Sequence, residues 1–295
     1  MKFGKVSNPE LIDFTLPVTT QITKDLISSF QKVKKPTLHI GCAKWNKTDL
    51  KGFYPKGVKD ELSYYSKQFN AIELNATFYR QFSADQFKKW HIKTPENFKF
   101  FPKITQEISH FKRLKHAQNT VNIFLENALH LQKKLGTIFL QMHSDFSPEN
   151  FEALHNFVIS WPKEIPLAIE VRHKNWFENK IVFEKFRQLL VTNNIAAILV
   201  DTAGRRDMLH MQLTNNEVFV RFVGANHLLD YKRLDDWVVC IKGWVALGLK
   251  NINFFIHQNT EESSPLLASY FVKQINKELD VCLKIPNQNQ QMSLL

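Results

Sequence analysis

The chain has 295 residues, of which 44% are hydrophobic and 23% charged, and its formal net charge is +11 at pH 7. These fractions are typical of a globular protein and exclude a disordered chain, a collagen and a disulfide-rich scaffold. No apolar run approaches the roughly 18 residues of a membrane helix, and the first residues lack the apolar core of a signal peptide. Three widely spaced cysteines, Cys42, Cys240 and Cys282, indicate neither a disulfide framework nor a zinc site. We therefore expect a cytoplasmic protein that does not bind membranes.

Eight short apolar runs recur along the chain, and amphipathic stretches separate them. They cover residues 37–42, 70–75, 97–103, 136–142, 166–171, 195–201, 217–223 and 251–257. Their starts lie 22 to 39 residues apart, and a strand with its loop and crossover helix needs about 30 residues. Runs this apolar suit parallel strands that are covered on both faces. The pattern predicts an α/β fold, a (β/α)8 TIM barrel over residues 37–282, with an open doubly wound sheet as the alternative.

Helical periodicity fills most of the gaps between the runs. It predicts helices near residues 59–69, 83–90, 118–136, 147–161, 183–193, 235–250 and 265–279. Residues 202–216 are poorly periodic, so an irregular or missing helix is expected there. Residues 1–36 are predicted to form an N-terminal extension with a weak helix near Thr23–Phe30 that covers the bottom of the barrel, and residues 283–295 a flexible C-terminal tail.

Polar side chains stand at the ends of several predicted strands. Side chains alternate along a strand, so one parity faces the barrel interior and the other faces the helices. In the fifth run the apolar set Leu167, Ile169 and Val171 should face the helices, which turns Glu170 and Arg172 inward. Applied to every run, this alternation predicts a polar cluster at the C-terminal rim, where barrel active sites lie. The cluster comprises Glu73, Asn75, Gln141, Glu170, Arg172, Asp201 and Arg221, with His39, Lys103 and His257 as lesser candidates.

A structural alternative exists for this cluster, because buried charges are also retained as paired internal networks. No Walker A, G-x-G-x-x-G, G-x-S-x-G or H-E-x-x-H string occurs. The AGRRD string at 203–207 fits a solvated loop better than a phosphate-binding loop. Some strand-end side chains are of types that bind metals, but their spacing is not diagnostic and we assign no metal. These are Glu73, His143, Glu170, Asp201 and His257.

Charge and aromatic residues near the predicted top loops raise a second possibility. Residues 1–150 hold 23 Lys and Arg against 13 Asp and Glu, whereas residues 151–295 hold 16 against 15. Such asymmetry fits either a solvated lysine-rich surface or the binding of nucleic acid. The loop aromatics are expected to form a hydrophobic lid, with stacking on a base or sugar as the alternative. They are Trp45, Tyr54, Phe78, Tyr79 and Trp176.

Several strings in the chain are similar to one known family, the domain-of-unknown-function family 72 (DUF72), also called YecE-like. They are IGCAKW (40–45), GFYP (52–55), LSYYSKQFNAIELNATFYR (62–80), TPENFKFFPK (94–103), KLGTIFLQM (134–142), AIEVRHKNW (168–176) and VFVRFVG (218–224). The resemblance implies a TIM barrel, and it implies no reaction. It marks as site positions Glu73, Asn75, Thr77, Tyr79, Arg80, Lys103, Gln141, Glu170, Arg172, Trp176, Asp201 and Arg221. Ala43 and Lys44 depart from the Ser and Gly that the family's first loop usually carries, which excludes a hydroxyl role at position 43.

We predict from these residues an enzyme that acts on a phosphate- or carboxylate-bearing substrate at the rim, with hydrolysis and isomerisation both open. The candidates for general acid or base are Glu170, Glu73 and Asp201. The candidates for substrate binding are Arg172, Arg221, Lys103, Asn75, Gln141, Tyr79, Arg80 and Trp176. The cofactor and the oligomeric state stay unknown at this point. The alternatives are a nucleic-acid-binding or nucleic-acid-processing protein and a non-catalytic scaffold.

Overall fold

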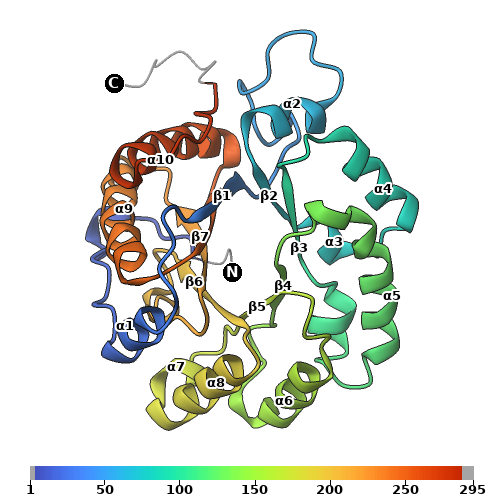
Figure 1. Ribbon diagram of the computed structural model, residues 1–295, viewed down its shortest axis with the longest axis vertical. Helices are drawn as coiled ribbons and strands as arrows, with labels where there is room; N and C mark the ends of the chain where they lie inside the picture. Colours follow the sequence, from blue (N-terminus) through green and yellow to red (C-terminus); the bar gives the residue numbers. More distant parts are fainter. Residues whose placement is uncertain (1–3, 288–295) are drawn as a thin grey trace.

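Parallel strands surrounded by helices make up the protein, whose computed structural model describes residues 4–287 (Figure 1). Eight strands occur in this part of the chain, at the eight apolar runs of the sequence. They are β1 Thr37–Cys42, β2 Ala71–Leu74, β3 Lys99–Pro102, β4 Ile138–Gln141, β5 Leu167–Glu170, β6 Ala196–Asp201, β7 Glu217–Gly224 and β8 Asn251–Gln258. Six strands form one curled parallel sheet in the order β1-β8-β7-β6-β5-β4, and β2 pairs in parallel with β3.

The two-stranded sheet lies between β1 and β4 in Figure 1 and is linked to both. On the β4 side, isolated parallel bridges join Phe100 to Leu135 and Lys103 to Phe139. On the β1 side, the side chain of Asn70 substitutes for a strand neighbour: its Oδ1 accepts from Ile40 N at 2.9 Å. These links hold the C-terminal ends of β2 and β3 beside those of the larger sheet.

Glycine permits the closest approach between β1 and β2. A Cβ atom on Gly41 would meet the carbonyl oxygen of Ala71 at 2.1 Å, far inside van der Waals contact. The hydroxyl of Tyr65 completes the junction, because it accepts from Cys42 N at 2.7 Å and donates to Ala71 O at 3.2 Å. At this junction, side-chain hydrogen bonds therefore replace the backbone hydrogen bonds that join neighbouring strands elsewhere.

The helices lie outside the strands in Figure 1. Their bounds are α1 Gln21–Ser28, α2 Glu61–Gln68, α3 Ala76–Tyr79, α4 Ala84–Lys93, α5 Gln118–Ala128, α6 Phe151–Ser160, α7 Asn175–Glu178, α8 Lys180–Thr192, α9 Leu229–Leu247 and α10 Ser264–Leu279. The single helix expected over 118–136 is wrong in its second half: α5 ends at Ala128 and a 3-10 turn follows. Gln132 within that turn has φ 52° and ψ −130°, which breaks the helical backbone.

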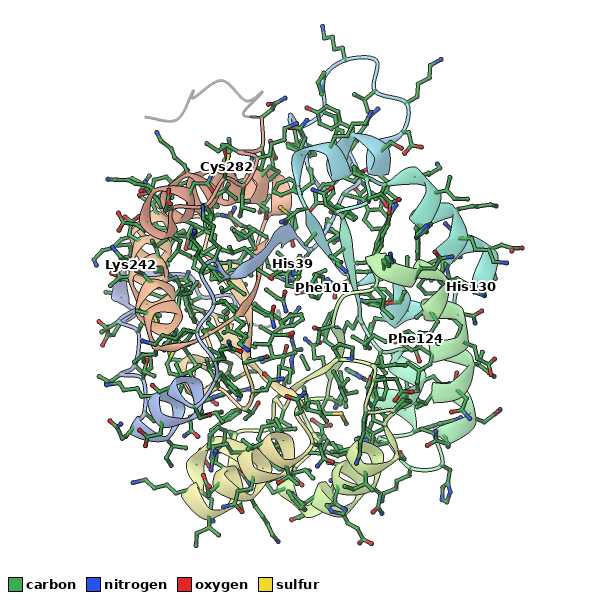
Figure 2. All side chains as sticks on the ribbon, in the orientation of Figure 1. His39, Phe101, Phe124, His130, Lys242 and Cys282 are labelled. Carbon is green, nitrogen blue, oxygen red and sulfur yellow. The ribbon has the colours of Figure 1, made fainter. Side chains whose placement is uncertain are left out.

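Strand alternation separates two apolar layers. Leu167, Ile169 and Val171 pack in the large core shared with the helices, as the alternation predicted. The opposite face of the strands encloses a second cluster, in which Phe101 contacts Phe255 with ring centroids 4.8 Å apart. Figure 2 shows Phe101 and His39 inside the ring of strands, whereas Lys242 lies outside it on α9. The inner cluster is Ala71, Phe101, Phe139, Ala168, Ala196, Ile198, Val200, Met208, Phe219 and Phe255.

The N-terminal extension does not cover the bottom of the strands as expected. Its helix α1 packs against α9, and Figure 1 places it around the ring between α9 and α8. The connection from β6 to β7 has no α-helix, since it holds only the 3-10 turn Arg206–Met208. The extension therefore supplies an outer helix where the local sequence supplies none. The expected tail at 283–295 lies partly outside the described residues, and Leu283 is held by two hydrogen bonds to the Asn276 side chain.

Thr23 ties this extension to the β6–β7 connection. Its buried hydroxyl donates to Met211 O at 3.4 Å and accepts from Leu213 N at 3.1 Å. A Thr23→Val substitution keeps the shape and leaves both backbone groups without their partner, so we expect a loss of about 1–3 kcal/mol of unfolding free energy in urea titration. The control is Thr48→Val, because Thr48 lies on an exposed turn. It should change the free energy of unfolding by less than about 0.5 kcal/mol. Equal effects of the two variants would contradict this anchoring role.

No helix within residues 4–287 has the length and apolar character that crossing a membrane requires.

Candidate functional site

A buried arginine stands between two buried glutamates at the C-terminal ends of the strands. The guanidinium of Arg221 on β7 donates to both carboxylate oxygens of Glu73 on β2, at 3.0 and 2.9 Å. Its third nitrogen donates to Glu170 on β5 at 2.6 Å. The three side chains are 6%, 0% and 1% exposed, respectively. A planar guanidinium suits this two-sided contact, which a lysine could not make.

Glu73 has two further partners. Nδ2 of Asn75 donates to its Oε1 at 2.8 Å, and Nε2 of His257 on β8 lies 2.9 Å from its Oε2. Burial alone would raise the pKa of this carboxyl. The opposing charges of Arg221 and His257 outweigh burial and hold the pKa well below the usual range. Glu73 is therefore a fixed carboxylate at neutral pH.

Glu170 is held from the opposite side of the rim. Nε of Arg172 donates to its Oε1 at 2.5 Å, and Nε2 of Gln141 lies 3.0 Å from each carboxylate oxygen. Burial would raise the pKa of Glu170, but the charges of Arg172 and Arg221 lower it to about 2. Arg172 remains 17% exposed, so its charge is the one in this cluster that is nearest to solvent.

Lys103 brings an amine into the same cluster. Its Nζ donates to Oε1 of Gln141 at 2.7 Å and lies 4.0 Å from the ring centroid of Phe78. Among residues 4–287, no carboxylate oxygen lies within the 4.0 Å of an ion pair with this nitrogen. Burial, followed by the positive charges of Arg221 and Arg172, lowers the pKa of Lys103 to about 7.

The ELNATFYR part (73–80) of the strings similar to DUF72 has a physical explanation in the structure. Thr77 donates to the carbonyl oxygens of Leu74 at 2.8 Å and of Lys103 at 2.7 Å, which ties the end of β2 to the end of β3. The last two residues of the string turn away from the cluster. Tyr79 is 71% exposed, and Arg80 lies over the ring of Phe82 at 4.4 Å. Neither contacts the buried charges.

Asp201 lies in a different place from the one expected. Ala197 and Leu199, which share its parity, belong to the outer core, so Asp201 faces the helices. It is fully buried, pairs with Arg233 of α9 at 2.8 Å and with Arg206, and accepts from Trp237 Nε1 at 2.8 Å. Asp201 therefore joins the strand end to α9 and is separate from the glutamates of the rim.

Two other candidates are also distant from the cluster. Trp176 is fully buried in the outer core, where its Nε1 donates to Phe146 O at 2.7 Å. His39 lies near the beginning of β1, with Nδ1 2.8 Å from Oδ1 of Asn253. A second polar group at that end is Glu217, and burial raises its pKa to about 7. These contacts lie at the opposite end of the strands from Glu170.

The sequence reading missed His110 as a neighbour of the rim. It belongs to a five-residue π-helix, Glu107–Phe111, a conformation that is frequent at functional sites. Its ring lies 4.8 Å from that of Phe78 and 5.0 Å from that of His143. Burial and then the charge of Lys103 lower the pKa of His110 to about 4. No hydrophobic periodicity in the sequence predicts this π-helix. Only a search for histidines after strand ends would have identified His110.

The remaining residues predicted to lie in loops contact other parts of the protein. Trp45 packs edge-on against Trp90 with ring centroids 5.9 Å apart, as expected of a hydrophobic lid. Tyr54 donates to the backbone of Trp45. In the AGRRD loop, Arg205 pairs with Asp207 at 2.7 Å. Across the part of the chain that the structure describes, no three His, Cys, Asp or Glu side chains gather as a metal site requires.

The family model for proteins of unknown function DUF72 matches residues 39–292 of this chain. The chain belongs to the DUF72 family. It is 25% identical over 279 residues to the UPF0759 protein YecE of Escherichia coli, covering 87% of this chain and 99% of YecE. It is 29% identical over 155 residues to the UPF0759 protein YunF of Bacillus subtilis, covering 48% of this chain and 52% of YunF. The residues of the rim cluster all lie within the DUF72 match.

Solved DUF72 structures show the same fold. A crystal structure of a DUF72 family protein from Enterococcus faecalis, at 2.52 Å resolution, superposes with a TM-score of 0.66 at 20% identity. The superposition covers 85% of this chain and 100% of that protein. A second structure of that protein, at 3.10 Å, gives a TM-score of 0.64 at 21% identity. At this level of identity the likeness concerns the fold alone.

Proposed function

We propose that the eight strands form a closed (β/α)8 barrel, with the cluster of Glu73, Glu170 and Arg221 at its C-terminal mouth. The bridges between β3 and β4 and the side-chain junction between β1 and β2 support this closure. So does the inner cluster of aromatic side chains, which fills the interior as a barrel core does. In barrels of this kind the C-terminal mouth is where substrates bind.

We infer that this DUF72 protein is an enzyme that acts on a phosphate- or carboxylate-bearing substrate at that mouth. One observation carries the proposal: five charged side chains from the ends of four strands meet in one place, and four of them are buried, where an apolar core would cost less. Arg172 is the cation that binds the substrate's anion, and Lys103 places an amine beside it. The two glutamates act as carboxylates that orient the cations or accept a proton. Hydrolysis and isomerisation are both compatible with these groups. The five side chains are Glu73, Lys103, Glu170, Arg172 and Arg221.

Arg172 gives the direct test, because its side chain is 17% exposed and is the most exposed of the five. Wild-type protein is screened by thermal shift against inorganic phosphate and a panel of small phosphorylated and carboxylated metabolites. For any ligand that raises the melting temperature, we expect Arg172→Ala to weaken binding about tenfold or more in calorimetric titration. Glu170→Gln should also change the affinity.

The matched control is Arg187→Ala on α8, where Arg187 pairs with Glu184 at 2.6 Å away from the rim cluster. It should leave the affinity unchanged. If Arg172→Ala and Glu170→Gln both fold and bind the ligand as the wild type does, the site assignment is wrong and the scaffold alternative gains support.

The nucleic-acid alternative finds less support in the side chains. Positive charge is abundant in the loop before α2, at Lys44, Lys47, Lys51, Lys56 and Lys59. The aromatics of the same loop pack against rings: Trp45 on Trp90, and Tyr54 on Phe53 and Tyr64. Base stacking would require such rings to be open to solvent. These ring contacts therefore favour a small anionic substrate over a nucleic acid.

A further inference from the structure

Among residues 4–287 two lysines, Lys103 and Lys134, are buried, and their surroundings differ. Nζ of Lys134 donates to the carbonyl oxygens of His91 at 2.7 Å and Thr94 at 2.6 Å, and lies 3.6 Å from a carboxylate oxygen of Glu96. Three oxygens thus lie around this nitrogen. Within the part of the chain that the structure describes, Nζ of Lys103 has one oxygen acceptor, the amide of Gln141, and otherwise faces the ring of Phe78.

The charges near Lys103 are a second difference between its surroundings and those of Lys134. Arg221 and Arg172 stand near Lys103 and disfavour a third positive charge, while Glu73 and Glu170 are already bonded to these arginines. The histidine of the neighbouring π-helix, His110, adds no compensating negative charge. A buried amine in such a place gives up its proton at neutral pH and becomes a nucleophile. Burial is the largest cause of the lowered pKa of Lys103, and the charges of the two arginines add to it.

We propose that Lys103 is a catalytic nucleophile that forms an imine with an aldehyde or ketone substrate bearing a carboxylate or phosphate, whose anionic group Arg172 binds. This rests on the proposed function, since it places the substrate's anion at the same rim. The geometry supports it: Nζ stands at the end of β3 in the cluster, linked through Gln141 to the carboxylate that Arg172 contacts. Thr77 fixes the lysine's backbone through its carbonyl.

The chemistry balances without an added oxidant or reductant. The lone pair of neutral Nζ forms a bond to the carbonyl carbon, and one amine proton passes to the carbonyl oxygen, which gives a carbinolamine. The hydroxyl group then leaves with the second amine proton as water, and the C=N bond of the imine remains. Once the imine nitrogen is protonated, the neighbouring carboxylates of Glu73 and Glu170 stabilise its positive charge.

Reductive trapping tests the proposal on the full chain. The protein is incubated with glyoxylate, a carboxylate-bearing aldehyde, and reduced with sodium borohydride, and the modified peptides are mapped by mass spectrometry. We expect Lys103 to carry at least about tenfold more adduct than Lys134 or any surface lysine at pH 7, because ordinary lysines are almost fully protonated there. Labelling of Lys103 should rise from pH 6 and level off above about pH 8, since its pKa is about 7, whereas labelling of surface lysines should continue to rise.

Variants and a neutral aldehyde separate this inference from the proposed function. Lys103→Met should abolish the dominant adduct, while Lys134→Met should keep it. Arg172→Ala should reduce trapping of glyoxylate more than trapping of acetaldehyde, which has no anionic group. If an anion binds through Arg172 and Lys103 is labelled no more than Lys134, the imine is excluded and the proposed function stands. If no anion stabilises the protein and acetaldehyde alone labels Lys103, the anionic substrate is excluded instead.

Discussion

An Arg221→Met protein is expected to lose about 3–5 kcal/mol of unfolding free energy. The substitution removes the cation that donates to Glu73 at 2.9 and 3.0 Å and to Glu170 at 2.6 Å. Both carboxylates are almost fully buried, so they cannot recover the lost stabilisation from water. Chemical denaturation followed by circular dichroism measures the effect.

The control removes a surface ion pair of the same type. Lys232→Met breaks the contact of Lys232 with Asp236 on the exposed face of α9, where the two charges lie 3.3 Å apart. Such pairs contribute about 0–1 kcal/mol. Part of the loss in Arg221→Met should return in Arg221→Met combined with Glu170→Gln, because one buried charge no longer needs a partner. A loss below about 1 kcal/mol in Arg221→Met would show that the glutamates find other partners and that the ion pair is dispensable.

Stability should fall steeply in acid. The pKa of Glu170 is about 2 in the folded protein and 4.5 in its ordinary state, so the unfolded chain binds more protons between these values. The stabilisation is therefore complete above about pH 4.5 and is lost as the pH falls towards 2. Glu170 alone should account for about 3 kcal/mol over this range, and Glu73, whose pKa is also lowered, adds to the loss.

Denaturant titrations between pH 2 and 7 check this dependence. Glu170→Gln should lower stability at neutral pH and flatten the profile between pH 4.5 and 2. Glu278→Gln is the control, since Glu278 is held by Lys242 at 2.9 Å on the protein surface, where water and salt screen the pair. An acid profile that is as steep in Glu170→Gln as in the wild type would show that other groups cause the loss.

Strand alternation predicted part of the cluster and failed at one strand for a clear reason. In β5 one parity is apolar and the other ends in Glu170, so the pattern distinguishes the two faces. In β6 both parities are apolar: Ala196, Ile198 and Val200 on one face, and Ala197 and Leu199 on the other. The pattern carries no information about which set faces inward, and only packing against α9 turns Asp201 outward.

Alternation also does not predict whether a side chain lies near the N-terminal or the C-terminal end of the strands. His39 has the parity of an interior residue, and Figure 2 shows it inside the ring. It lies near the start of β1, so it contacts Asn253 at the opposite end from the rim. The sequence leaves open which way Lys103 points, because phenylalanines precede it on both faces of the strand. Phe101, which has the same parity, faces inward in the structure, and Lys103 therefore does too. The position of His110 depends on a π-helix that sequence patterns do not reveal.

Eight strands, the helices between most of them and the inward direction of four polar side chains follow from the amino-acid sequence alone. These side chains are Glu73, Gln141, Glu170 and Arg221. Local hydrophobic periodicity encodes these features, because each depends on neighbours a few residues apart. The contacts between charges depend instead on the three-dimensional fold, as do the position of α1 in place of a missing helix and the position of Lys103 beside two arginines and Gln141. Such contacts join residues far apart in the chain, and the pKa of a buried amine depends on all the charges that the fold brings around it.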